Sequence, residues 1–170
     1  MAAPASDTPV PWTTTAVAAS GAAPGTPAAA AIELRSGILA MTQTAEDAVL
    51  RPTDAGAWPH DLRAALAARI ARHNRSDALA TAYAAMAGPS PHAALADPAA
   101  ASPDATLAAA LRFVDRVATN PRDTTADDIK VLQAAGISDA DIVRLTELVA
   151  FMGYQVRLSA GLALLAETRS

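Results

Sequence analysis

The chain has 170 residues, no cysteine and a formal net charge of −4, with 52% hydrophobic, 4% aromatic and 18% charged residues. The absence of cysteine excludes disulfides, thiol nucleophiles and cysteine-ligated metals within this sequence. The mildly acidic balance, with a pI of about 5.2, argues against nucleic acid or an anionic membrane as the main partner. Alanine, the strongest helix former, is the most frequent residue, so the sequence predicts an all-α protein.

The length suits one domain preceded by a tail. Residues 1–26 are rich in Ala, Pro, Thr, Ser and Gly, and we expect them to be disordered because they lack apolar periodicity. Residues 27–170 are expected to form a single domain of about six or seven helices. No uncharged apolar run reaches the length of a membrane span, and the first residues lack a secretory pattern. We therefore expect a cytoplasmic protein with no membrane partner.

Capping residues, prolines and glycines divide the domain into helices. Gly88 and Gly136 stand at expected helix ends, and cap-and-acid pairs at Thr125 and Ser138 begin the last two helices. Residues 88–102 contain several prolines and are expected to form a loop. In chain order, helices are expected over about residues 27–43, 44–51, 59–73, 76–87, 103–120, 125–135 and 138–167.

The faces of two helices are readable from the spacing of their apolar residues. In the first helix, the residues that fall near one face are Ile32, Ile38, Leu39 and Met41. In the helix over 59–73, the apolar stripe consists of Leu62, Leu66 and Ile70. At about 100° per residue, Arg69, Arg72 and Arg75 fall opposite that stripe, where a solvated face is a simpler interpretation than a nucleic-acid interface.

The last helix has two apolar faces. One stripe runs along its whole length, through Ile142, Leu145, Val149, Met152, Val156 and Ala160. A second stripe begins at Phe151 and continues through Tyr154, Leu158, Leu162 and Leu165. A helix that is apolar on two faces should be buried on both, so we expect it to be the central helix of the bundle or half of an oligomer interface.

Three segments resemble the carboxymuconolactone decarboxylase superfamily, which includes alkylhydroperoxidase D. His60–Tyr83 is similar to the core helix pair of that family, in which an asparagine-containing turn precedes a CxxC pair and a histidine. Asp128–Glu167 is similar to the C-terminal half of peroxidase-related members, and Arg112–Asp123 to the segment that joins the two. The resemblance implies an alkylhydroperoxidase D-like helical bundle in a cysteine-poor branch of the superfamily.

The resemblance also identifies the positions at which peroxidase chemistry is missing. When Asn74 is aligned with the family's turn asparagine, the two cysteines correspond to Ser76 and Leu79. The relay histidine then corresponds to Tyr83 and the relay glutamate to Ala64. Peroxide reduction needs an attacking thiolate, a resolving thiol and a proton relay, so we predict no thiol peroxidase activity. This interpretation makes the chain a degenerate partner or structural subunit that associates with its own kind, or with a related subunit, through its last helix.

A second hypothesis is an enzyme that transfers protons on a small organic acid, as decarboxylase members of the superfamily do without thiols. Arg63 and Arg157 could bind a carboxylate, and Tyr83 or His60 could move a proton. Each residue also has a structural explanation: a packed arginine stem for Arg63, a core aromatic for Tyr83, and for Arg157 an ion pair with Asp115 or Glu167. Neither hypothesis requires a cofactor, and the histidines, His60, His73 and His92, lack metal-binding spacing.

Overall fold

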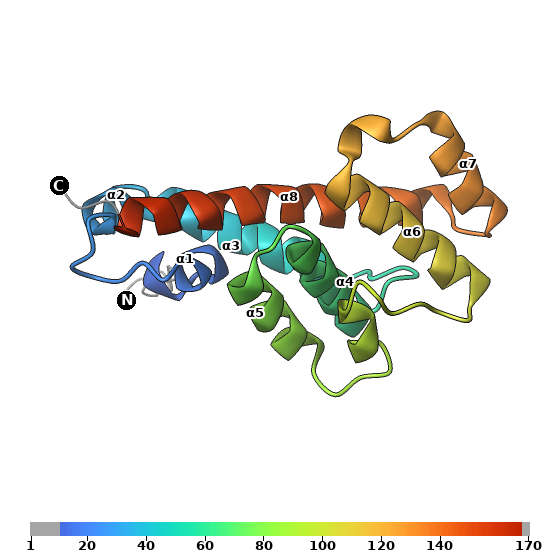
Figure 1. The fold of residues 1–170 in the computed structure, drawn as a ribbon, viewed down its shortest axis with the longest axis horizontal. Coiled ribbons are helices and arrows are strands. Elements are labelled where there is room, and N and C mark those ends of the chain that lie inside the picture. The colour runs from blue at the N-terminus through green and yellow to red at the C-terminus, as the bar shows by residue number, and fades with distance from the viewer. Residues whose placement is uncertain (1–10, 168–170) are drawn as a thin grey trace, which may run out of the picture.

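The computed structural model describes residues 11–167. Within that range the protein contains eight α-helices and no strand, which confirms the all-α prediction (Figure 1). The helices are α1 (Thr15–Ser20), α2 (Ala29–Leu34), α3 (Ser36–Leu50), α4 (His60–His73), α5 (Asp77–Ala87), α6 (Ala105–Thr119), α7 (Ala126–Ala134) and α8 (Asp139–Glu167). Short 3-10 turns occur at Pro11–Thr13, Ala93–Ala96 and Pro121–Asp123.

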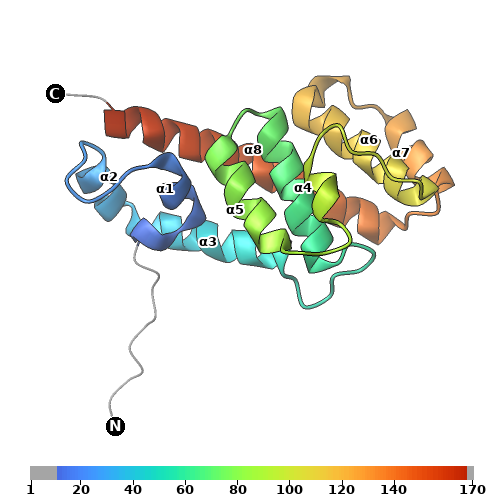
Figure 2. The ribbon, with the colours of Figure 1, turned by 60° about the horizontal axis from the view of Figure 1, so that its bottom comes forward.

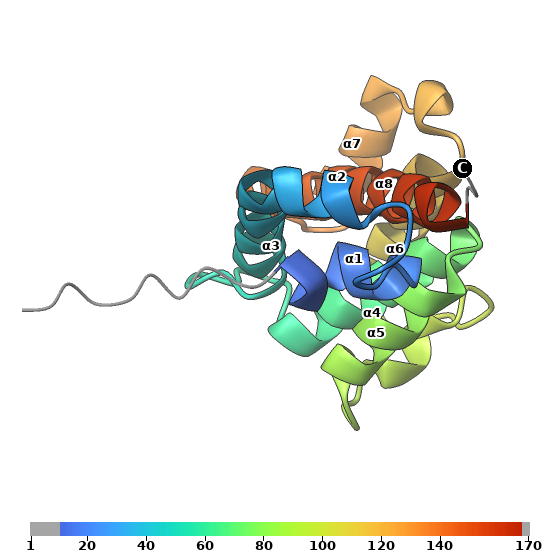
Figure 3. The same ribbon diagram turned by 90° about the vertical axis from the view of Figure 1, so that its left-hand side faces the viewer.

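Helices α3 and α8 lie side by side and antiparallel, and together they form one layer of the fold (Figures 1 and 3). The hydroxyls of Thr42 and Tyr154 join the two helices at 2.9 Å. Towards the C-terminus of α8, Leu165 and Ile32 line the same groove. The 29 residues of α8 contact α1, α3, α4, α6 and α7, as expected of a central helix. Its second apolar stripe is only partly buried, however, since Tyr154 and Leu165 are exposed.

Helices α4 and α5 form a hairpin that lies across the α3–α8 layer (Figures 1 and 2). Every residue of α4 from Leu62 to Ala71 is buried, on all sides of the helix. Five alanines in that stretch let neighbouring segments approach the α4 backbone closely: Ala64, Ala65, Ala67, Ala68 and Ala71. The alanine-rich sequence of α4 therefore produces a fully enclosed helix at the centre of the main core.

Helices α6 and α7 pack at the N-terminal end of α8, and α7 rises above the α3–α8 layer there (Figure 1). The predicted capping box of α7 is present, with the Thr125 backbone N–H donating to Asp128 Oδ2 at 2.8 Å. The N-cap of α6 is Asp104, whose side chain accepts from the Leu107 N–H, so this helix begins two residues later than predicted.

Part of the tail that was predicted to be disordered, residues 1–26, forms helix in the structure. Residues 1–10 lie outside the described residues. From residue 11 onward the segment is ordered: α1 packs on α5 and α8, and Val17 is fully buried. The physical reason is that Val17 joins a small second core with Ile32 and Leu39. In addition, Thr15 donates hydrogen bonds to the side chains of Gln43 and Glu46 on α3. This short contact region was not visible as a periodic pattern.

The first predicted helix differs in its bounds and in its faces. The chain forms α2 and α3 with an interruption at Arg35, and α3 continues through Thr44 without a new start. Ile32 and Leu39 are buried, as a common apolar face requires. Ile38 and Met41 are instead exposed, because a turn of about 100° per residue separates them from Leu39 and Thr42, which face the core.

Candidate functional site

The turn between α4 and α5 holds the residues that correspond to the redox centre of the resembled family. Arg75 has a left-handed backbone conformation, with φ of 57°, and the Ser76 N–H donates to the Ala71 carbonyl at 2.9 Å. The Asn74 side chain donates to the Ile70 carbonyl at 2.9 Å, which closes the end of α4. Ser76 is half-buried at the N-cap of α5.

The other three corresponding positions lie inside the core. Ala64, Leu79 and Tyr83 are all buried, and Leu79 packs in the main hydrophobic cluster. A methyl group, a leucine side chain and a phenol cannot supply a peroxidatic or resolving sulfur. Of these side chains only Tyr83 carries a titratable group, so the chemistry of this region depends on what the Tyr83 hydroxyl contacts.

Tyr83 belongs to a buried polar cluster centred on Glu46, which the sequence analysis did not identify. The Tyr83 hydroxyl donates to Glu46 Oε2 at 3.0 Å, and Gln155 Nε2 donates to the same oxygen at 2.7 Å. Thr15 Oγ1 and Gln43 Nε2 donate to Glu46 Oε1 at 2.6 Å and 3.2 Å. One carboxylate therefore joins four helices: α1, α3, α5 and α8.

Burial dominates the electrostatics of this cluster. Desolvation raises the pKa of Glu46 above its ordinary value, against the opposing effect of hydrogen bonds from Thr15, Tyr83 and Gln43. Desolvation and the neighbouring Glu46 also raise the pKa of Tyr83. Gln155 Oε1 is buried without a hydrogen-bond partner, so one acceptor stands beside a carboxyl group that burial drives towards protonation.

The Glu46 cluster is suited to holding helices together. Glu46, Tyr83 and Gln155 are each exposed by 1% or less, which leaves no surface for a substrate to contact. The spacing of Leu39, Thr42, Glu46 and Leu50 follows a single helical face, and this was the sequence signal that could have placed Glu46 in the core.

The Arg63 side chain hydrogen-bonds backbone carbonyls at the end of α3 and in the connection that precedes α4. It is 2% exposed, and its Nε donates to the Trp58 carbonyl at 2.8 Å. Its Nη1 and Nη2 donate to the carbonyls of Val49 at 2.8 Å and Ala55 at 3.0 Å. This guanidinium therefore fixes the α3–α4 connection, and both of its terminal nitrogens are already engaged where a carboxylate would have to bind.

Arg157 lies in a different environment, on the exposed side of α8. Its Nη1 donates to the Gly153 carbonyl at 2.7 Å, in place of the predicted ion pair with Asp115 or Glu167. Its side chain lines a cavity of about 350 Å³ between the ends of α4 and α6 and the middle of α8. Neither Arg63 nor Tyr83 lines that cavity, so the structure does not assemble the predicted group of two arginines and a tyrosine.

The prediction that Arg69 belongs to a solvated face is wrong. Arg69 is 3% exposed, and its Nε and Nη2 donate to the two carboxylate oxygens of Asp115 at 2.6 Å and 2.7 Å. Its remaining donors reach loop carbonyls, those of Leu95, Asp97, Pro98 and Ala100. Arg69 therefore fixes the loop after α5 to α4 and α6, and Arg72 also bonds the Ala96 carbonyl.

The histidines serve separate local contacts. His73 Nε2 lies 2.8 Å from Asp115 Oδ1, and His92 Nδ1 lies 2.7 Å from Asp61 Oδ2. His60 Nε2 lies 3.0 Å from the Pro52 carbonyl. Residues 11–167 contain no group of three or more His, Cys, Asp or Glu side chains that could hold a metal ion.

The outer face of the α3–α8 layer, on the side away from α4 and α5, carries several exposed apolar side chains. Leu34, Ile38 and Met41 are 83%, 53% and 68% exposed, and Tyr154 and Leu165 of α8 are 45% and 51% exposed. We define the outer face by Leu34, Ile38, Met41, Ala45 and Ala48 of α2–α3 and by Tyr154, Leu158 and Leu165 of α8.

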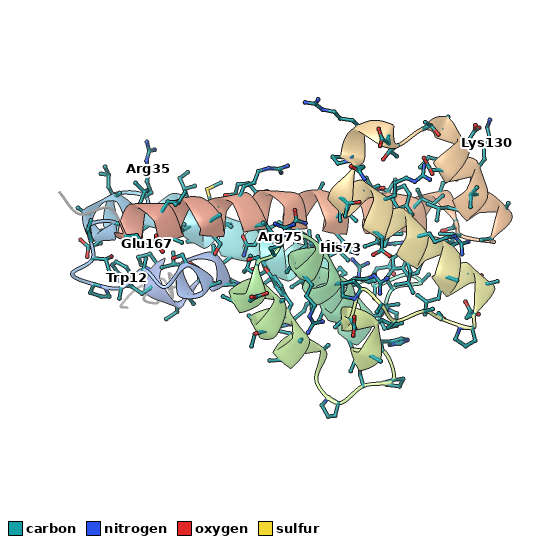
Figure 4. All side chains as sticks on the ribbon, viewed as in Figure 1. Trp12, Arg35, His73, Arg75, Lys130 and Glu167 are labelled. Carbon is teal, nitrogen blue, oxygen red and sulfur yellow. The ribbon has the colours of Figure 1, made fainter. Side chains whose placement is uncertain are left out.

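A groove of about 440 Å³ runs between the two halves of the outer face. Its walls are almost entirely apolar and consist of Ala31, Ile32, Ile38, Leu39, Leu158, Leu162 and Leu165, with Arg35 as the one charged side chain. Arg35 points away from the rest of the fold (Figure 4). The α8 stripe was predicted from the sequence, whereas the α2–α3 stripe was not, although the spacing 34, 38, 41, 45, 48 is its signal there.

Helix α8 is long and apolar enough to cross a membrane by length and composition alone. Of its most apolar 18 residues, 28% are buried in the fold. This is weak evidence for a membrane span, because the core helix of a water-soluble protein satisfies the same criterion.

In comparisons with known proteins, no family model, no curated protein and no solved structure matches the chain.

Proposed function

We propose that this protein is a cysteine-less relative of the carboxymuconolactone decarboxylase and alkylhydroperoxidase D-like proteins that acts as a structural or partner subunit in the cytoplasm. The observation that carries the proposal is the exposed apolar outer face of the α3–α8 layer. Contiguous apolar surface bordered by polar residues is typical of association sites. The function is therefore association through this face.

The absence of redox chemistry follows from the side chains at the α4–α5 turn. Two of the four corresponding positions, Ala64 and Leu79, carry no reactive group and are buried. Tyr83 is buried too, and its hydroxyl is bound to Glu46. A serine hydroxyl at Ser76 cannot be oxidised and resolved as a thiol can. These contacts support a scaffold role for the helix pair in place of catalysis.

Binding of a small organic acid beside Arg157 is a second candidate, and one observation favours it. The cavity beside Arg157 is also lined by Asn74, Thr119 and Thr146, which add polar groups to its wall. Tyr83, the predicted proton-transfer group, does not line that cavity. Binding of small mono- and dicarboxylates can be titrated by calorimetry against the Arg157→Gln variant. If heats are equal in the two proteins, or absent from both, this candidate is eliminated.

Two measurements test the leading proposal. Sedimentation velocity over a wide concentration range should show a species larger than the monomer, and hydroperoxide consumption should stay at the background of a buffer blank. A protein that is monomeric at every concentration and has no partner in pull-downs would overturn the association role. Turnover of hydroperoxide above the blank would overturn the loss of redox chemistry.

A further inference from the structure

We propose that the outer face binds a second copy of this chain, with the two α3 helices antiparallel across a two-fold axis that passes beside Met41. The inference rests on the proposed association function and specifies its partner and geometry. The two α8 helices would then lie beside the two α3 helices and complete a four-helix arrangement.

The α2–α3 stripe has the spacing of a helix–helix seam. Its residues, Leu34, Ile38, Met41, Ala45 and Ala48, follow steps of four, three, four and three, which average about 3.5 residues. All five are exposed in the single chain. The break at Arg35 does not interrupt the stripe, because the Leu39 N–H still donates to the Arg35 carbonyl and the Arg35 N–H to the Ala31 carbonyl.

The order of large and small residues along the stripe makes it complementary to itself. In an antiparallel pair centred on Met41, Leu34 lies opposite Ala48 of the second copy and Ile38 lies opposite its Ala45. Each large side chain therefore faces a small one, and the two Met41 side chains meet at the axis. A parallel pair would place leucine against leucine at one end and alanine against alanine at the other, with an uneven separation of the helices. A two-fold axis perpendicular to the helices requires this self-complementary pattern.

Charge at the ends of the stripe favours the same orientation. Glu33 and Arg51 are both exposed. Measured around the helix axis, each lies about 100° from the centre of the stripe, and both lie on the same flank of it. A two-fold axis keeps that side in common and reverses the chain direction, so Glu33 approaches Arg51 of the second copy. The pairing occurs twice, once at each end. The outer face as defined contains no charged residue, and Arg35 of the groove lies near one end of the stripe, so its two copies stand at opposite ends of an antiparallel pair.

The rest of the fold leaves room for this arrangement. Helix α8 presents Tyr154, Leu158 and Leu165 on the same side as the α3 stripe, with the apolar groove between them. Helix α7 rises above the layer only at the N-terminal end of α8 (Figure 1). An antiparallel pair places the two α7 helices at opposite ends, where neither covers the Met41 axis.

The absence of native cysteine allows a direct test by single-cysteine cross-linking. Met41→Cys should oxidise to a disulfide-linked dimer, because residues beside a two-fold axis meet their own copies. Ile38→Cys and Ala45→Cys should each stay largely monomeric alone and should cross-link when mixed. Bridging requires Cα atoms within about 7 Å, so the pattern reports the register. Val131→Cys, an exposed apolar position on α7, is the matched control and should not cross-link.

Sedimentation equilibrium provides a second measurement that does not depend on thiol chemistry. Met41→Glu should raise the dimer dissociation constant by about a hundredfold or more, because two carboxylates would meet at the axis. Val131→Glu should leave it within about threefold. Circular dichroism should show unchanged helix content in both variants, since both native side chains are more than half exposed.

The outcomes separate this inference from the proposed function. If the wild-type chain associates but Met41→Cys does not cross-link and Met41→Glu has no effect, the antiparallel geometry is refuted and the association role stands. If Ile38→Cys cross-links efficiently with itself, the pair is parallel and the inference is likewise refuted. If the wild-type chain is monomeric throughout and instead floats with neutral phospholipid vesicles in a Met41-dependent manner, the partner is a lipid surface and both proposals fall.

Discussion

Replacement of Glu46 tests whether the buried carboxylate has the role that its contacts indicate. Removing the side chain in Glu46→Ala leaves two donors, the Tyr83 hydroxyl and Gln155 Nε2, buried without their acceptor. A stranded buried donor costs about 1–3 kcal/mol, so the expected loss in the free energy of unfolding is about 2–6 kcal/mol. That is a large fraction of the roughly 5–15 kcal/mol by which a domain is stable.

Glu46→Gln should behave differently, because the cluster can adapt to an amide. The Tyr83 hydroxyl can rotate to accept a hydrogen bond. The Gln155 amide can turn so that its Oε1, which has no partner in the native structure, accepts from the new amide group. We therefore expect Glu46→Gln to cost no more than about 1.5 kcal/mol near neutral pH, the net worth of one hydrogen bond.

The pH dependence has a definite sign. Because folding raises the pKa of Glu46 above its ordinary 4.5, the folded state favours the protonated carboxyl. The resulting stabilisation is fully present below that ordinary value and is lost as pH rises through the folded pKa. Glu46→Gln cannot titrate at this position. As pH rises above 4.5, the free energy of unfolding of the variant minus that of the wild type should therefore increase.

Guanidinium unfolding from about pH 4 to 8, followed by circular dichroism, measures this difference. Asp61, Asp115 and Asp141 have pKa values lowered below 3.8, so the stabilisation they contribute is lost only at more acidic pH. Subtracting the wild type from the variant removes the other titrating groups. If the difference between the two proteins is constant across this range, the folded pKa of Glu46 is not raised and the desolvation argument is refuted.

Three further predictions concern the other buried groups. Arg69→Met should lower the free energy of unfolding by about 3–5 kcal/mol in chemical denaturation, because it strands a carboxylate and several loop carbonyls; a loss below 1 kcal/mol would contradict this. Arg63→Ala should cost at least about 2 kcal/mol in the same assay, whereas Arg157→Ala, at an exposed position, should stay within about 0.5 kcal/mol. In Ser76→Cys the thiol should react readily with Ellman's reagent and in Leu79→Cys it should be protected, and the double variant should still consume no hydroperoxide; equal thiol reactivity would contradict the burial assigned to these positions.

Local signals predicted the helices, and tertiary packing decided their faces. The helix bounds over 60–73 and 77–87 follow from prolines, caps and a terminal glycine, which act within a few residues. Ile38 and Met41 are large apolar residues like Leu39, yet of the three only Leu39 is buried. Which of two apolar stripes faces the core depends on where α8 lies, and no property of α3 alone carries that information.

The buried charges were unpredictable for a related reason. Arg69 lies on α4 among alanines, and the usual expectation places an arginine on the solvated side. That expectation fails on α4 because its small side chains are enclosed on every side, so the long arginines reach through the core to loop carbonyls. Arg63 and Arg69 thus connect an alanine-rich helix to the loops around it by donating to loop carbonyls, which an alanine side chain cannot do.

Because large apolar side chains are scarce in this chain, their exposure on the outer face needs an explanation. An exposed leucine or methionine on an ordinary protein surface needs no explanation. In this chain, which has 4% aromatic residues and relies on alanine for its core, Leu34, Ile38 and Met41 are exposed side by side. Full burial of one such side chain is worth about 1.5–3 kcal/mol. In the antiparallel pair Met41 is buried in both copies at the axis, so the self-association test at Met41 probes a source of stabilisation that the single chain leaves unused.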